Sequence, residues 1–82
     1  MINVYKLSFV KRSKERKKVL SALSKPMFPK EIDNEVKLGF NRVSRALKEL
    51  TEEGLVECLT PENKRGRIYK RTKQGENLIK EL

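Results

Sequence analysis

The sequence predicts a small, mainly helical α+β domain with a three-helix core, a two-stranded β-hairpin and a C-terminal helix. Apolar residues recur at helical spacing in the segments expected to form the helices. Two β-prone segments flank a glycine-containing loop, which is the pattern of a hairpin. A chain of 82 residues has room for one small core, so we expect residues 1–82 to form a single domain.

The net charge of +9, with no histidine, predicts attraction to a polyanion, either nucleic acid or an anionic membrane surface. No apolar run approaches the ~20 residues of a membrane span, and residues 1–10 lack the pattern of a signal peptide. One cysteine cannot form an internal disulfide, which fits a reducing compartment. We therefore expect a cytoplasmic protein with no membrane partner.

Residues 1–10 form an apolar N-terminal arm whose secondary structure the pattern leaves open. Tyr5, Leu7 and Phe9 alternate as in a strand, while Tyr5 and Phe9 are also one helical turn apart. In one interpretation the arm packs on its own domain, and in the other it contacts a second copy of the chain.

Ser13 is a suitable N-cap for a helix that runs to about residue 24 and buries Val19, Leu20 and Leu23. The start of this helix is rich in cations, namely Lys11, Arg12, Lys14, Arg16, Lys17 and Lys18. These side chains either form a solvated face or reach phosphates, since phosphate contacts need only charge and length.

Pro26 ends this helix, and Pro29 suits the first turn of a second, short helix over residues 29–36. A turn over residues 37–39 leads into a third helix, residues 40–53, which ends at Gly54. Two helices joined by a short turn form a helix-turn-helix, here residues 29–53.

The third helix is strongly amphipathic. Its apolar face is formed by Val43, Leu47 and Leu50, with Phe40 and Ala46 at the edges. Its opposite side is polar and consists of Asn41, Arg42, Ser44, Arg45 and Lys48. The cations come first and three glutamates come last, which reverses the order that the helix dipole favours. This order suits a helix whose first half contacts a polyanion.

The hairpin is predicted over residues 55–72, with β-prone segments 55–60 and 67–72 around a turn. Its tip carries Lys64, Arg65 and Arg67, which either reach a phosphate backbone or protect an exposed sheet edge. Thr72 is a suitable cap for a final helix over residues 73–82. Cys58, in the first segment, is either a small core residue or a redox-sensitive thiol that links two chains.

Three stretches carry a resemblance to a known family: PKEIDNEV, NRVSRALKELTEEGLVE and GRIYKRTKQGENL. In this order and spacing they are similar to the support helix, the recognition helix with its following strand, and the wing return of winged helix-turn-helix transcription regulators. The resemblance is to the MarR-like and ArsR-like groups of prokaryotes, particularly archaea, and covers most of residues 29–78.

The resemblance implies that the polar side of helix 40–53 faces the DNA major groove and that residues 61–67 are a wing on the backbone or minor groove. The DNA-binding residues it implies are Asn41, Arg42, Ser44, Arg45, Lys48, Lys64, Arg65 and Arg67. We add Lys30, a cation near the start of helix 29–36, to the expected DNA-binding residues. Two positions depart from the family pattern. Lys37 replaces a common turn glycine, which predicts either a positive φ at a residue with a side chain or a changed turn. Arg71 replaces an apolar residue, which predicts an exposed wing base or a further phosphate contact.

We therefore expect a transcription regulator that binds double-stranded DNA sequence-specifically, with a second copy of the chain as a candidate partner. Family members often dimerise through long terminal helices, whereas the last helix here is short. The alternative is a winged-helix module that binds RNA or another protein. With no histidine and one cysteine, His-based acid–base catalysis and Cys/His metal sites are excluded, so we expect no enzyme activity, metal or cofactor.

Overall fold

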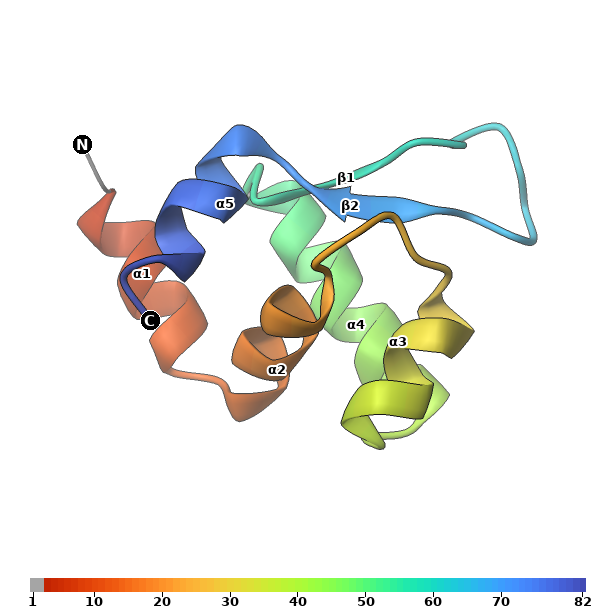
Figure 1. Ribbon diagram of the computed structural model, residues 1–82, viewed down its shortest axis with the longest axis horizontal. Coiled ribbons are helices and arrows are strands. Elements are labelled where there is room, and N and C mark those ends of the chain that lie inside the picture. The colour runs from red at the N-terminus through yellow and green to blue at the C-terminus, as the bar shows by residue number, and fades with distance from the viewer. Residues whose placement is uncertain (1–2) are drawn as a thin grey trace.

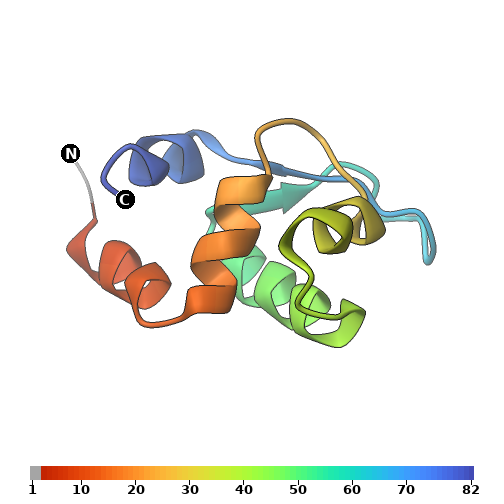
Figure 2. The same cartoon turned by 60° about the horizontal axis from the view of Figure 1, so that its bottom comes forward.

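The computed structural model describes residues 3–82, which form five helices and one two-stranded antiparallel sheet. In chain order the elements are α1 (Val4–Lys11), α2 (Lys14–Ala22), α3 (Pro29–Val36), α4 (Phe40–Glu52), β1 (Val56–Cys58), β2 (Tyr69–Arg71) and α5 (Lys73–Ile79). Helices α2, α3 and α4 pack together beside the hairpin (Figure 1). The hairpin loop extends at one end of the molecule, and α1 and α5 lie at the other (Figure 2). This arrangement confirms the predicted winged helix-turn-helix fold.

One apolar core joins the helices to the base of the hairpin. The buried hydrophobic residues come from all these parts of the chain: Val10, Val19, Leu20, Leu23, Met27, Ile32, Val43, Ala46, Leu47, Leu50, Leu55, Val56 and Leu78. Because each helix turns its apolar stripe into this core, its charged side faces outward. No helix in residues 3–82 combines the length and the apolar character that crossing a bilayer requires.

The N-terminal arm forms helix α1, so the strand alternative is wrong. The helix starts after Asn3, whose side chain accepts a 3.2 Å hydrogen bond from the Lys6 N–H. Val10 is buried in the core, whereas Val4 and Tyr5 are 75% and 88% exposed. The contact with a second copy stays a prediction.

Helix α2 begins where the sequence predicts, because the Ser13 hydroxyl accepts a hydrogen bond from the Arg16 N–H at 3.2 Å. It ends at Ala22, two residues earlier than residue 24, since Leu23 already has a non-helical ψ of 55°. The chain then turns toward the sheet. Met27 exchanges two backbone hydrogen bonds of 2.9 Å with Tyr69, which fixes the start of α3 against the hairpin.

Asp33 holds the turn of the helix-turn-helix. Lys37 has the predicted positive φ, 55°, and its N–H donates to the Asp33 carbonyl at 2.7 Å. Gly39, with φ 98°, donates its N–H to the Asp33 carboxylate at 2.8 Å. Helix α4 begins at the next residue, so these two hydrogen bonds set where α4 starts.

The hairpin strands are shorter than the predicted segments. Their register pairs Val56 with Arg71 and Cys58 with Tyr69. Beyond that pair the Leu59 N–H still donates to the Ile68 carbonyl at 2.7 Å. The Ile68 N–H, however, donates to the Thr60 hydroxyl at 3.0 Å instead of to a backbone carbonyl, so the regular ladder stops there. Residues between the strands therefore form a long loop rather than a tight turn.

The predictions for Arg71 are wrong, because its side chain is only 10% exposed. It lies 3.1 Å from the Glu76 carboxylate as an ion pair, although its Nε lacks hydrogen-bond geometry. Arg71 is therefore neither an exposed wing base nor free for a phosphate. Thr72 caps α5 as predicted, since its hydroxyl accepts a 3.1 Å hydrogen bond from the Gly75 N–H. The helix ends at Ile79, three residues before the predicted end at residue 82.

Replacing Lys37 by glycine should stabilise the fold. A residue with a Cβ in the left-handed region costs roughly 1–2 kcal/mol, and the greater freedom of glycine in the unfolded chain offsets part of the gain. We expect the free energy of unfolding, measured by urea denaturation, to rise by about 0.5–1 kcal/mol. Glu35→Gly, inside α3, is the control and should lower it by about 1 kcal/mol. A loss in Lys37→Gly as large as that of the control would contradict the turn geometry.

Candidate nucleic-acid interface

The polar side of α4 is turned away from the core, as the helical spacing predicts. Asn41, Arg42, Arg45 and Lys48 are exposed, and Ser44 is half-buried. The buried side of the same helix is formed by Val43, Ala46, Leu47 and Leu50. The burial of that side fixes the rotation of α4 about its axis, and this rotation directs the amide and cationic groups to solvent.

A groove of about 880 Å³ lies between α4, the start of α3 and the hairpin loop. Its walls carry cations from all three parts of the chain: Lys30 from α3, Lys48 from α4, and Lys64, Arg65 and Arg67 from the loop. Ser44 also lines it. The structure thus brings the predicted wing residues to the same groove as part of the predicted recognition face.

The other predicted residues lie outside the groove. Asn41 and Arg45 project from α4 beside it and are exposed. Arg42 lies on the side of α4 that faces α2, where its Nε is 3.5 Å from the Glu15 carboxylate. Its side chain is 65% exposed, so this surface ion pair contributes little to stability and is open to exchange for a phosphate.

The loop is held by its own polar groups. Arg67 donates its Nε–H to the Asn63 carbonyl at 2.7 Å, which closes the turn at the tip. No ion pair or side-chain hydrogen bond within residues 3–82 engages Lys64 or Arg65. Arg67 therefore shapes the loop as well as adding charge, while Lys64 and Arg65 extend freely into solvent.

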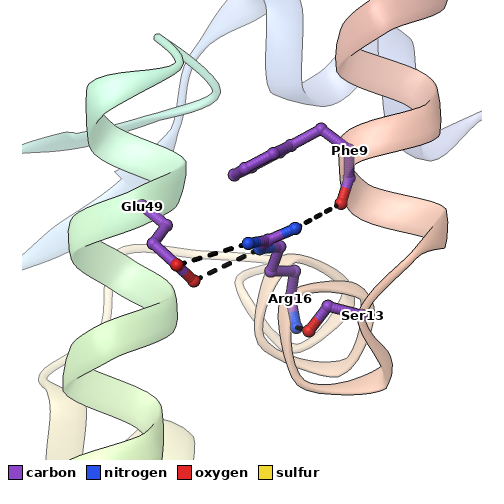
Figure 3. Close-up of polar contacts among 4 residues, drawn as sticks. All are labelled: Phe9, Ser13, Arg16 and Glu49. Carbon is purple, nitrogen blue, oxygen red and sulfur yellow. Dashed lines mark hydrogen bonds and ion pairs between the residues drawn. The ribbon is translucent and has the colours of Figure 1, made fainter.

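The sequence patterns did not distinguish Arg16 from the other cations of α2, although its side chain makes several polar contacts. Its guanidinium donates two 3.2 Å hydrogen bonds to the Glu49 carboxylate and one of 2.8 Å to the Phe9 carbonyl (Figure 3). The same group lies 3.8 Å from the centre of the Phe9 ring, a cation–π contact. Arg16 thus ties α1 and α2 to the recognition helix, and it is not available to a phosphate.

Arg16 also sets the charge state of Glu49. Its hydrogen bonds hold the pKa of Glu49 below the ordinary value of 4.5, partial burial opposes this, and the positive charges of Arg16 and Arg45 lower the pKa further. The carboxylate is thus ionised at neutral pH, and the positive charge of Arg16 balances its negative charge on the side of α4 that faces α2.

No group of three histidine, cysteine or acidic side chains in residues 3–82 is placed to hold a metal ion. Cys58 is half-buried in the groove wall, opposite Tyr69 in the sheet register. The lining of the groove combines its cations with aromatic side chains, Phe28, Phe40 and Tyr69.

No protein-family model matches the chain, and no curated protein sequence matches it. Solved structures do match. The reduced form of MarR from E. coli superposes with a TM-score of 0.77 and 28% identity, over 94% of this chain and 59% of MarR. A mutant MarR from E. coli complexed with operator DNA has a TM-score of 0.75 and 27% identity, over 92% of this chain and 56% of that one.

TubR from Bacillus thuringiensis serovar israelensis, bound to 24 bp of tubC, has a TM-score of 0.79 over 98% of this chain and 91% of TubR. At 13% identity this match shows the fold alone. Together the matches define the chain as a winged helix-turn-helix domain of the type found in MarR transcription regulators. It spans little more than half the length of the two MarR chains, at 59% and 56%. These structures are bacterial, so the archaeal character stays a prediction.

The lowered pKa of Glu49 predicts an acid-dependent loss of stability. The bonded carboxylate stabilises the fold fully above the ordinary pKa of 4.5, and this contribution is lost as the pH falls through the lowered folded-state value. Urea denaturation at pH 7 and pH 3 should therefore show a smaller acid-induced loss for Glu49→Gln than for the parent chain. Glu52→Gln, one turn on and exposed, is the control and should keep the parental loss. Equal losses in all three proteins would contradict the role of the Arg16–Glu49 pair.

Proposed function

We propose that this chain binds double-stranded DNA in a sequence-specific manner and regulates transcription. The observation that supports the proposal is that Ser44 and Lys48, from the polar side of α4, line the same groove as the cations of α3 and the hairpin loop. The major groove of B-DNA, ~12 Å wide, admits one α-helix. Helix α4 enters it, and the hairpin loop lies on the adjacent backbone or minor groove.

Base reading falls to the side chains at the centre of the exposed side of α4. Arg45 has the forked donors that match the O6 and N7 acceptors of guanine, and Asn41 matches the donor and acceptor of adenine. Arg42 provides a second guanidinium group that can make the same bidentate contact with guanine after its ion pair with Glu15 is broken. Ser44 contacts a base or a phosphate from the groove side.

Phosphate contacts fall to the cations around the groove. Lys30 at the start of α3, Lys48 on α4, and Lys64, Arg65 and Arg67 in the loop are all exposed. Such contacts fix the position of the protein on the duplex without reading its sequence. Because each one displaces condensed counterions, the affinity should fall steeply as the salt concentration rises.

The solved structures support this function by analogy. The MarR mutant is complexed with operator DNA, and TubR is bound to 24 bp of tubC. A second copy of the chain is the partner we propose besides DNA, because a palindromic site needs two recognition helices related by two-fold symmetry. We assign the chain no enzymatic role and place it in the cytoplasm, where its DNA target would be.

Selection of bound duplexes from a random pool is the first experiment, because it yields the preferred sequence, the spacing of half-sites and their symmetry. A titration of the selected duplex against duplex RNA of the same sequence then separates DNA binding from the RNA-binding alternative. Preference for the RNA, or recovery of no common sequence, would contradict the proposal.

Arg45→Ala should weaken binding to the selected duplex by ~1–3 kcal/mol and relax the preference at one base pair. The physical reason is the loss of a bidentate contact with a base edge. Fluorescence anisotropy with the selected duplex and its single-base variants measures both effects. Arg45→Lys is the matched variant, since it keeps the charge but loses the fork and should also lose the base preference. If Arg45→Ala keeps the parental affinity and base preference, the proposed placement of α4 in the major groove is wrong.

The double variant Lys64→Ala/Arg65→Ala should weaken binding to all duplexes alike and reduce the dependence of affinity on salt. Both side chains are exposed on the loop, where they reach phosphates rather than base edges. The measurement is the slope of the logarithm of the affinity against that of the salt concentration. Lys80→Ala is the control, because Lys80 directly follows α5, which lies at the end of the molecule away from the loop (Figure 1). A loss confined to one sequence would argue against a phosphate role.

A further inference from the structure

The first residue of the recognition helix is an exposed aromatic. Phe40 is 57% exposed, although it begins the helix whose Val43 and Leu50 are fully buried. The sequence places Phe40 at the edge of the apolar side, and the structure leaves it out of the apolar residues that pack against the core. The fold itself therefore does not explain why this position is apolar.

The position of Phe40 is fixed by the turn before it. Gly39 donates its N–H to the Asp33 carboxylate, and its carbonyl accepts a 3.1 Å hydrogen bond from the Val43 N–H. The backbone of the residue before Phe40 is thus held from both sides. A side chain presented from a fixed backbone suits recognition, because little freedom is lost on binding.

The surroundings of Phe40 select the kind of partner. Its ring lines the groove together with Ser44, Lys48 and the cations of α3 and the loop. An apolar protein surface seated there would bury these cations without partners, which is strongly unfavourable. A polyanion neutralises these cations. The partner of Phe40 must therefore be a polyanion that also presents an apolar group to the ring.

The chemistry of B-DNA offers one such group. Among the base-pair edges in the major groove, only thymine presents an apolar substituent, its C5-methyl group, and phenylalanine is one of the side chains that contact it. We infer that Phe40 contacts a thymine methyl group in the target site and so determines specificity at that position. This inference rests on the proposed function, since it requires α4 to lie in the major groove.

Phe28 provides a matched control. It is also exposed, at 40%, and lines the same groove. Its ring lies beside Gly66 of the hairpin loop, where a Cβ on that glycine would be 3.7 Å from the Phe28 Cε1 atom. Phe28 thus supports the loop, and it lies before α3 rather than on the recognition helix.

The test replaces thymines by deoxyuridine, one at a time, in the duplex selected from the random pool. Deoxyuridine lacks only the methyl group, so base pairing and every hydrogen-bonding atom are kept. For the parent chain we expect the replacement at one position to weaken binding by about three- to five-fold, which is the loss of affinity expected when one buried methyl group is removed. The quantity compared between variants is the ratio of the affinity for the thymine duplex to the affinity for the deoxyuridine duplex at that position. In Phe40→Ala that ratio should fall to about one, while Phe28→Ala and Phe40→Leu should keep most of it.

Two failures are distinguishable. If the parent chain selects no common duplex, the proposed function fails and the inference with it. If it selects one, the inference alone is overturned when no thymine lies under α4, when no deoxyuridine weakens binding, or when Phe40→Ala keeps the ratio. Circular dichroism checks the fold of each variant. A Phe40→Ala chain that does not fold would also count against the inference, because it would make this exposed side chain a structural one.

Discussion

Burial of one side of α4 is the constraint on which the rest of the structure depends. Val43, Leu47 and Leu50 are almost completely buried, and they belong to one core that also includes residues from every other helix and from β1. A helix that buries one side must expose the other. The same residues that stabilise the fold therefore place Asn41, Arg45 and their neighbours in solvent. Core packing alone thus sets which side of α4 is available for the proposed DNA binding.

The remaining contacts limit how α4 can move once it is buried. The Asp33 hydrogen bonds fix the residue where it starts, and Arg16 clamps Glu49 near its C-terminal end. The hydrogen bonds between Met27 and Tyr69 hold the hairpin against the start of α3, so the groove keeps its three walls. A recognition surface assembled from separate elements needs such fixed spacing, because small displacements misalign base contacts.

Local signals made much of the fold predictable from the sequence. Helix α3 has the predicted bounds, because Pro29 starts it and the turn ends it, and the caps Ser13 and Thr72 begin the predicted helices. Sequence reasoning failed where a partner is distant in the chain or a local signal is weak. Arg16 appeared as one of many surface cations, since nothing local reveals Glu49, 33 residues away. In the predicted interface, spacing predicted which side of α4 is exposed, but it did not predict that Arg42 faces Glu15.

The central claim is that one surface, formed by α4, the start of α3 and the hairpin loop, meets the DNA. A titration of the isotopically labelled chain with its selected duplex, followed by backbone amide NMR shifts, tests this most directly. We expect the largest shifts at residues 40–48 and 64–67 and near Lys30, with little change in α1 and α5. Shifts concentrated in α1 and α5, with residues 40–48 unaffected, would contradict it.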